Sequence, residues 1–138
     1  MIIRVFLFLA LSFSYFVSAE QISIMSYNLN NLFDAQDDVG KDDKAYLPIE
    51  FKNNDDHIMG CLQVNNSKWR NECLFLDWSE EVVQKKISNI SDLLISMGES
   101  QPDIIAIQEI ENLNVPRMLF SKIEALGYTD FALIEGRS

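Results

Sequence analysis

Two side chains able to bind a hard metal ion stand at the ends of predicted β-strands. Asn28 directly follows an alternating apolar and polar pattern at 21–27, and Glu109 ends a run that is apolar at 104–107. A glutamate at the end of a buried strand is unfavourable unless it is paired, hydrogen-bonded or bound to a cation. Mg²⁺ requires oxygen ligands and often takes only one or two carboxylates, because water and substrate phosphate complete its shell. The spacing alone is compatible with a metal site but favours the more ordinary alternative, in which Glu109 is exposed and Asn28 shapes a turn.

The elements that position these side chains alternate between strands and helices. Apolar residues recur at helical steps in two stripes, the first at Val83, Ile87, Ile90, Leu94 and Met97 and the second at Val115, Leu119, Ile123 and Leu126. The first stripe lies between predicted strands at 21–27 and 103–109, and the second precedes a predicted strand at 131–134. This order predicts an α/β fold with parallel neighbouring strands. Because parallel strands end at the same edge of a sheet, we expect Asn28 and Glu109 to meet there.

The strand at 103–109 is expected to be buried on both faces, since it is apolar at four consecutive positions. Two consecutive right-handed crossovers in one direction leave both helices on the same face of the sheet. The other face then needs a cover, which the rest of the sequence does not obviously supply. We therefore expect a partner or, in preference, a longer protein of which this chain is the N-terminal part.

The composition is that of one ordinary globular domain with an acidic surface. The chain has 138 residues, is 48% hydrophobic and carries a net charge of −10, which excludes a disordered or low-complexity chain. Residues 1–19 combine Arg4, an apolar stretch at 5–16 and small residues at 17–19, as is typical of a cleaved signal peptide. The stretch is shorter than the ~20 residues that span a bilayer. We expect a secreted or periplasmic protein without a permanent membrane anchor, with an uncleaved anchor as the alternative.

Two cysteines lie in a segment rich in acidic residues, at about 34–76. Export to an oxidising compartment favours a disulfide between Cys61 and Cys73, with unpaired thiols as the alternative. A zinc site is not expected, because His57 is the only histidine. The carboxylates lack the spacing of an EF-hand, so we interpret the segment as a long solvated insertion rather than a calcium loop. His57 is expected on its surface.

A family resemblance is carried by two ordered motifs, IMSYNLNNLFD at 24–34 and PDIIAIQEIEN at 102–112. They resemble the first two motifs of the endonuclease/exonuclease/phosphatase superfamily, the DNase I-like metal-dependent phosphohydrolases. The segment WRNECLFLDW at 69–78 is similar to the exported bacterial branch of that group. The resemblance covers 22–138 and implies the N-terminal half of a four-layer α/β-β/α sandwich, so that 20–138 is a partial domain.

The resemblance also implies roles for individual residues. Glu109 matches the acidic metal ligand, Asn28 matches the first-motif asparagine at the same metal, and Gln108 has a supporting role beside them. The implied metal is Mg²⁺, or Mn²⁺ or Ca²⁺, and it assists in-line attack of water on a phosphoester. The remaining machinery, an Asp/Asn pair and an Asp–His pair, lies downstream of the motifs present here. We therefore expect this chain to be inactive alone and to need a C-terminal half to complete the fold.

Nucleic acid is the substrate that the resemblance favours, with another phosphoester, such as that of a sphingomyelinase-like enzyme, as the alternative. A net charge of −10 opposes the binding of a polyanion. Lys85 and Lys86 are expected on the solvated side of the first helix, and Trp69 and Trp78 are expected to anchor the acidic segment rather than to stack on bases. A non-enzymatic exported binding module and a non-folding fragment are the competing interpretations.

Overall fold

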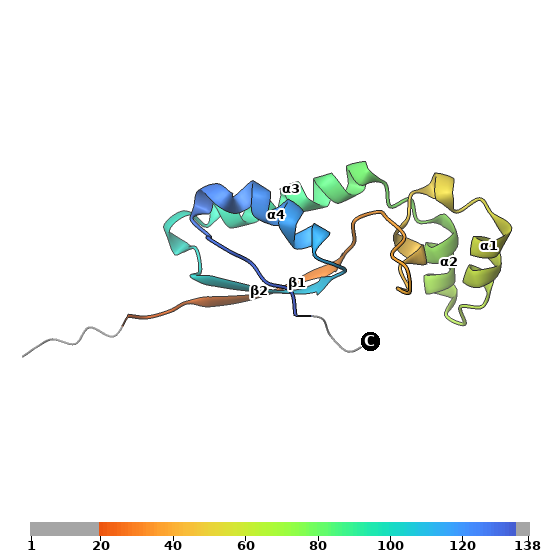
Figure 1. Ribbon diagram of the computed structural model, residues 1–138, viewed down its shortest axis with the longest axis horizontal. Helices are drawn as coiled ribbons and strands as arrows, with labels where there is room; N and C mark the ends of the chain where they lie inside the picture. The colour runs from red at the N-terminus through yellow and green to blue at the C-terminus, as the bar shows by residue number, and fades with distance from the viewer. Residues whose placement is uncertain (1–19, 135–138) are drawn as a thin grey trace, which may run out of the picture.

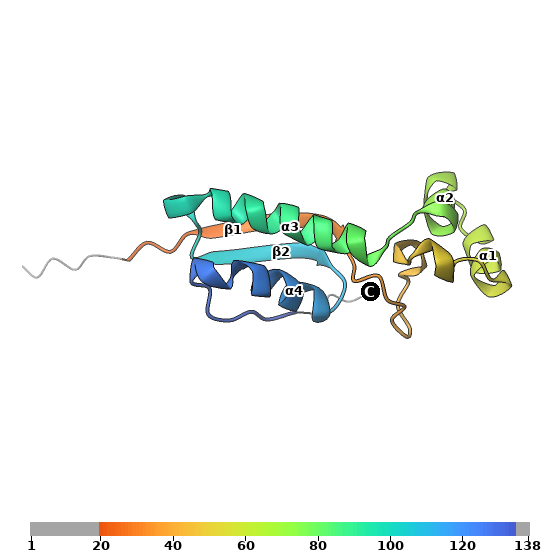
Figure 2. The same ribbon diagram turned by 90° about the horizontal axis from the view of Figure 1, so that it is seen from above.

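The protein is a mixed α/β structure in which two helices cover one face of a two-stranded sheet. The computed structural model describes residues 20–134, so the signal peptide predicted at 1–19 lies outside the described residues. Strands β1 (Ile24–Leu32) and β2 (Ile104–Ile110) pair in parallel. Helices α3 (Glu80–Ser96) and α4 (Asn114–Ile123) lie on the same side of the sheet (Figure 1; Figure 2). The predicted α/β class, parallel pairing and one-sided helices are confirmed.

The two predicted apolar stripes form the core between the helices and the sheet. Ser79 begins α3 as its N-cap, because its Oγ accepts a hydrogen bond from the Val82 backbone N–H at 3.4 Å. The buried core contains Val83, Ile87, Ile90 and Leu94 of α3, Val115, Leu119 and Ile123 of α4, and Leu29 and Leu32 of β1. Short 3₁₀ helices follow α3 and α4, namely η3 (Gly98–Ser100) and η4 (Glu124–Leu126). In the described part of the chain, no helix is both long and apolar enough to cross a membrane.

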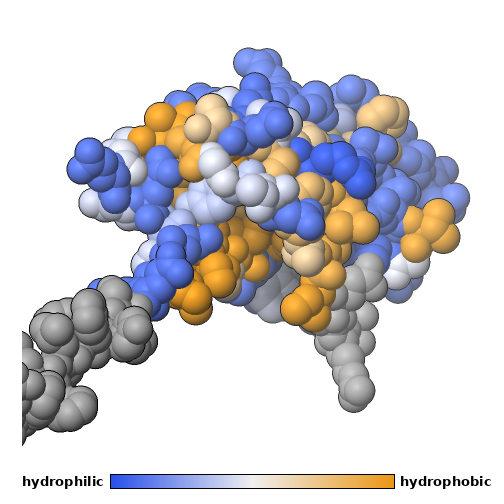
Figure 3. Space-filling model, turned by 60° about the vertical axis from the view of Figure 1, so that its left-hand side comes forward, coloured by the Kyte–Doolittle hydropathy of each residue, from blue (hydrophilic) through white to orange (hydrophobic). Residues whose placement is uncertain are grey.

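The opposite face of the sheet has no cover among residues 20–134. Side chains alternate along β2, so Ile105 and Ile107 pack toward the helices, whereas Ile104 and Ala106 are exposed on the other side. Ile24 is 66% exposed and Ile104 is 48% exposed. Hydrophobic surface is visible between hydrophilic regions in Figure 3. The expectation that this strand is buried on both faces is therefore wrong for this structure, because both helices lie on one side of the sheet.

The third strand predicted at 131–134 does not form among the described residues. The sheet has two strands, and the segment pairs with neither of them. The Phe131 backbone N–H donates to Asp130 Oδ1 at 2.8 Å, and the Phe131 ring packs on Phe120 of α4 with the ring centroids 5.2 Å apart. Aromatic packing against the helix thus takes the place of strand pairing.

The acidic segment at 34–76 is helical, although most of its side chains are exposed. It contains the 3₁₀ helices η1 (Lys44–Tyr46) and η2 (Ile49–Phe51) and the helices α1 (Asp55–Leu62) and α2 (Ser67–Phe75). The two helices form a lobe at one end of the molecule (Figure 1). Asn54 and Asn66 cap them, since each Oδ1 accepts a backbone N–H of the first helical turn. No sequence pattern indicated these helices, because helices this short show no sustained period, and caps and a cross-link stabilise them instead.

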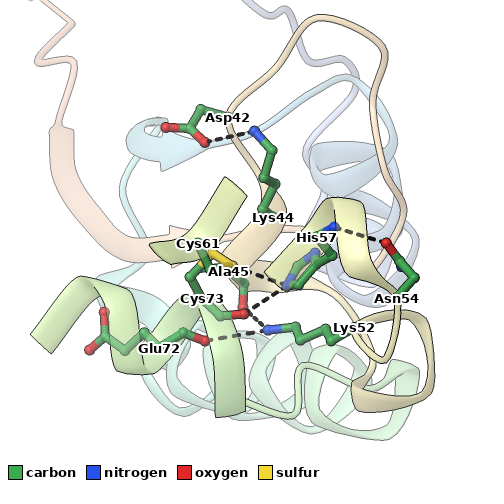
Figure 4. The surroundings of a disulfide bond; sticks show 9 residues. All are labelled: Asp42, Lys44, Ala45, Lys52, Asn54, His57, Cys61, Glu72 and Cys73. Atoms are coloured by element: carbon green, nitrogen blue, oxygen red, sulfur yellow. Dashed lines mark hydrogen bonds and ion pairs between the residues drawn. A yellow bond between two sulfur atoms is a disulfide. The ribbon is translucent and has the colours of Figure 1, made fainter. Parts of the chain in front are cut away.

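A disulfide joins Cys61 of α1 to Cys73 of α2, as predicted (Figure 4). His57 lies against it, with Nε2 2.9 Å from the Cys73 carbonyl oxygen and 3.2 Å from Cys61 Sγ. The expected surface position of His57 is wrong, because one helical turn separates it from Cys61 and directs it toward the buried sulfurs. Lys52 is buried beside them, where its Nζ donates to the Ala45 carbonyl at 2.9 Å, and burial lowers the pKa of Lys52 to about 8.

Candidate metal centre

Asn28 and Glu109 meet at the shared end of the two strands, as the sequence predicts. The strands run in parallel register up to the pair Asn28–Gln108. Asn28 Nδ2 donates a hydrogen bond to Glu109 Oε1 at 2.7 Å, and the Asn31 backbone N–H donates to Glu109 Oε2 at 3.1 Å. Each carboxylate oxygen is thus held by a donor from β1, which gives the carboxylate a defined orientation at the edge of the sheet.

The backbone leaves the extended conformation at this point in both strands. Between the pairs 28–108 and 32–110, β1 has three residues where β2 has only Glu109. The φ angle is 60° at Glu109, 52° at Asn30 and 61° at Asn31. Asparagine tolerates this left-handed region, whereas in other residues it costs on the order of 1 kcal/mol or more. The left-handed turn at Glu109 interrupts the alternation of β2 and brings its carboxylate to Asn28.

Lys86 of α3 ties this irregular turn to the helix layer. Its Nζ donates to the carbonyl oxygens of Asn30 at 2.6 Å and Asn31 at 3.1 Å, and it lies 5.1 Å from the centroid of the Trp78 ring. Burial lowers the pKa of Lys86. The expected solvated position is wrong for Lys86, because the carbonyls of the turn draw its ammonium inward, whereas Lys85 is exposed as predicted.

Gln108 lies beside the site on the open face of the sheet. Its Nε2 donates to the Ala106 carbonyl at 2.7 Å, and its Oε1 accepts from Ser26 Oγ at 3.4 Å. In the described residues no hydrogen bond joins Gln108 to the Glu109 carboxylate. The supporting role that the resemblance implies for Gln108 therefore stays a prediction.

Glu109 is the better placed metal ligand of the pair. Each of its carboxylate oxygens accepts one hydrogen bond, so lone pairs remain for a cation, and the side chain is exposed. Asn28 Oδ1 instead accepts from the Asn30 backbone N–H at 2.7 Å. Asn28 therefore orients Glu109 in this structure, and direct ligation by Asn28 stays a prediction. The residues fit a hard cation that keeps a shell mostly of water, as Mg²⁺ does.

A pocket of about 540 Å³ adjoins the site through Asn30 and Asn31. Its other lining residues include the cationic Lys44, Lys68 and Lys86 and the aromatic Tyr46, Trp69 and Trp78. Trp78 is buried and donates from Nε1 to the Phe33 carbonyl at 3.2 Å. Trp69 is 61% exposed. The expected anchoring role is therefore confirmed for Trp78 and wrong for Trp69, whose ring faces solvent at the pocket.

Sequence reasoning missed a second acidic group near the site. Asp34 and Asp43 are buried, and the Asp34 backbone N–H donates to Glu111 Oε2 at 3.0 Å. Burial raises the pKa of Glu111 to about 8, and the charges of Asp34, Asp43 and Asp38 act in the same direction. The sequence feature that could have indicated this acidic group is Glu-Ile-Glu at 109–111, which places two carboxylates at one strand end.

We predict that, in a chelating buffer, the free energy of unfolding falls as pH rises from about 5 to about 8. The pKa of Glu111 is 4.5 in the unfolded chain and about 8 in the folded protein. Between these values the folded protein holds a proton that the unfolded chain has lost, so stability that is fully present below pH 4.5 is lost as pH rises toward 8. Because Glu111 is only partly buried, we expect a loss of about 1 kcal/mol.

Urea unfolding at pH 5 and pH 8 measures this loss. Glu111→Gln should remove most of it, whereas Glu99→Gln, an exposed glutamate on η3, should leave it unchanged. An equal loss in Glu111→Gln and the wild type would contradict the prediction.

The described residues also bring three possible metal-ligand atoms within 4.8 Å of one another, from His57, Cys61 and Cys73. The two sulfurs are already joined to each other, and a metal requires free thiolates, so this group is part of the disulfide environment.

Comparisons of the chain with protein-family models, with curated proteins and with solved structures found no match.

Proposed function

We propose that the chain belongs to a divalent-metal-dependent phosphoester hydrolase and that the Glu109 carboxylate binds the metal. The 2.7 Å contact between Asn28 and Glu109, at the shared end of two parallel strands, is the observation that carries the proposal. In open α/β sheets, ligands bind beyond the carboxyl ends of the strands. The metal, Mg²⁺, Mn²⁺ or Ca²⁺, supplies Lewis acidity toward the phosphoryl oxygens. Glu109 holds it, and Asn28 fixes the direction of the carboxylate.

A phosphodiester of a nucleic acid is the substrate class that the surroundings support best. The exposed ring of Trp69 lines the adjoining pocket and offers a stacking surface for a base. Lys44 and Lys68 also line it, where they pair with Asp42 and Glu72. The net charge of −10 disfavours polyanions elsewhere on the surface, so binding is restricted to this pocket.

The uncovered face of the sheet supports a more specific proposal, that a second sheet packs against it. Ile24, Ile104 and Ala106 present apolar side chains without a cover from residues 20–134. A second sheet packed on this face would bury them and complete a four-layer α/β-β/α sandwich. The proposal is that the chain provides one half of such a sandwich.

Mn²⁺ binding to the full chain, followed by EPR spectroscopy, tests the metal site. One carboxylate with water is expected to bind Mn²⁺ weakly, at roughly millimolar concentration. Glu109→Gln keeps the shape of the side chain but removes its charge, so we expect at least a roughly tenfold loss of affinity. Glu99→Gln is the matched control and should bind as the wild type does. Equal affinity in Glu109→Gln and the wild type would refute the proposed site.

Hydrolysis of bis(p-nitrophenyl) phosphate with Mg²⁺ is the second measurement. The only histidine of the chain, His57, is buried against the disulfide and cannot act as a general base beside Glu109. We therefore expect metal binding without cleavage above background. If the wild-type chain cleaves the ester and Glu109→Gln does not, the expected inactivity of this chain is contradicted and the hydrolase assignment is supported.

A further inference from the structure

Both hydrogen bonds that the Glu109 carboxylate accepts within the described part of the chain come from one turn of β1. Residues 28–31 form it, and it is here called the 28–31 turn. Asn28 Nδ2 donates to Glu109 Oε1 at 2.7 Å, and the Asn31 backbone N–H donates to Glu109 Oε2 at 3.1 Å. The Asn30 backbone N–H holds the Asn28 amide in turn, since it donates to Asn28 Oδ1 at 2.7 Å. The direction of the carboxylate therefore depends on the conformation of the 28–31 turn.

The backbone of the 28–31 turn is unfavourable by itself. Asn30 and Asn31 have φ angles of 52° and 61°, in the left-handed region. Asparagine tolerates this region as a single residue, but two in succession persist only when the surrounding structure supports them. Asn30 is exposed and Asn31 is only partly buried, so packing of their side chains supplies little of that support. A contact to the backbone of the turn is therefore needed.

Lys86 of α3 makes this contact. Its Nζ donates to the two backbone carbonyl oxygens of the turn, at 2.6 Å to Asn30 and at 3.1 Å to Asn31. Hydrogen bonds from a charged donor are roughly twice as strong as those between neutral groups. The ammonium also lies 5.1 Å from the centroid of the Trp78 ring, and the cation–π attraction of this ring helps to fix its place.

Lys86 differs in this respect from the other two lysines of the adjoining pocket. Lys44 pairs with Asp42 at 3.7 Å, and Lys68 pairs with Glu72 at 3.8 Å. Among residues 20–134, no carboxylate forms an ion pair with Lys86, and both of its hydrogen bonds go to backbone carbonyls. The Lys86 ammonium is thus placed to hold the backbone of the turn rather than to neutralise an acidic side chain.

We propose that Lys86 is a positioning residue of the Glu109 metal site and that it acts through the 28–31 turn. Lys86 holds the two residues whose backbone N–H groups fix Glu109 directly and through Asn28. In the proposed function the Glu109 carboxylate binds the metal, and the role of Lys86 rests on that function. Groups that orient a metal ligand commonly affect metal affinity although they do not touch the ion. Without the Lys86 ammonium, the carboxylate should lose its fixed direction and bind a cation less well.

Mn²⁺ binding to the full chain, followed by EPR spectroscopy, tests this role in Lys86→Met. Methionine keeps an unbranched side chain for packing but lacks the ammonium. We expect the affinity for Mn²⁺ to fall at least roughly threefold. A purely electrostatic role of Lys86 would have the opposite effect, because removal of a positive charge favours a bound cation. Lys85→Met is the matched control, since it makes the same change at the neighbouring exposed position and should bind Mn²⁺ at least as tightly as the wild type does.

Amide hydrogen exchange of Asn31, measured by NMR without metal, is the second test. The Asn31 N–H is protected by its hydrogen bond to Glu109, and Lys86→Met should raise its exchange rate about tenfold. Lys85→Met should leave the rate unchanged. This measurement needs no metal binding, so it tests Lys86 even if Glu109→Gln and the wild type bind Mn²⁺ equally. Failure of the Glu109 site and failure of the role of Lys86 are therefore distinguishable.

Circular dichroism shows whether Lys86→Met is folded, and if it is not, Lys86→Gln provides the same test with a polar side chain. An unchanged exchange rate of Asn31 in the folded variant overturns the inference. Mn²⁺ affinity equal to or above that of the wild type also overturns it, provided that Glu109→Gln lowers the affinity.

Discussion

Ile87→Ala should lower the free energy of unfolding by about 2–5 kcal/mol. Ile87 is 0% exposed at the centre of α3, where it belongs to the core between the helices and the sheet. Truncation removes three methyl or methylene groups from contact and leaves a cavity that a two-layer structure fills poorly. Alanine is also the better helix former, so the loss measured in urea reports packing and not helix propensity.

Ile95→Ala is the matched control for this prediction. Ile95 lies on the same helix but is 48% exposed, and surface substitutions of this kind usually change stability by no more than about 0.5 kcal/mol. The two variants share the same change of side chain and differ in burial. Equal losses in both would contradict the packing of α3 on the sheet through its Ile87 face.

Cys61→Ser combined with Cys73→Ser should lower the free energy of unfolding by about 3 kcal/mol. The disulfide spans twelve positions and joins α1 to α2. The lobe buries little else, since within these two helices only His57, Cys61 and Cys73 are buried. Without the cross-link, two helices of eight and nine residues are too short to be stable alone. Their unfolding should precede that of α3.

Amide hydrogen exchange measures where this loss occurs. In the double variant, protection should disappear across α1 and α2 while α3 retains it. Reduction of the wild type with dithiothreitol is the control and should reproduce the same pattern, because it breaks the bond without a substitution. A loss below about 1 kcal/mol with α1 still protected would be the opposite of the expected result.

Patterns that repeat along the chain predict the main elements of the fold. The two apolar stripes predicted α3 and α4. The order of strand and helix predicted the parallel pairing that brings Asn28 to Glu109. The even pair of cysteines predicted the disulfide. Each of these predictions depends on the spacing of apolar residues, the order of the elements or the number of cysteines, all of which can be taken directly from the sequence.

Contacts between distant segments were beyond such reasoning. The burial of Asp34 was missed because its partners, Glu111, Asn112 and Asn114, lie far along the chain. His57 was misplaced because its ring is buried against a disulfide and contacts the Cys73 carbonyl of another helix.

Lys86 was expected in solvent, but its ammonium donates to the Asn30 and Asn31 carbonyls of a distant turn. Trp69 was expected to be an anchor, but its side chain is exposed. A side chain in a segment without a period gives no local indication of which way it faces.

The sequence by itself determined the α/β class, the core stripes, the disulfide and the edge at which Asn28 and Glu109 meet. Only the tertiary structure decided how they meet: a left-handed turn at Glu109, with extra residues in β1 opposite it, aims the carboxylate at the asparagine. Only the tertiary structure, likewise, brought Asp34 to Glu111 and Asn112. The physical reason is that helix and strand periods follow from neighbours within a few residues, whereas backbone strain and buried charge are tolerated only when distant segments compensate for them.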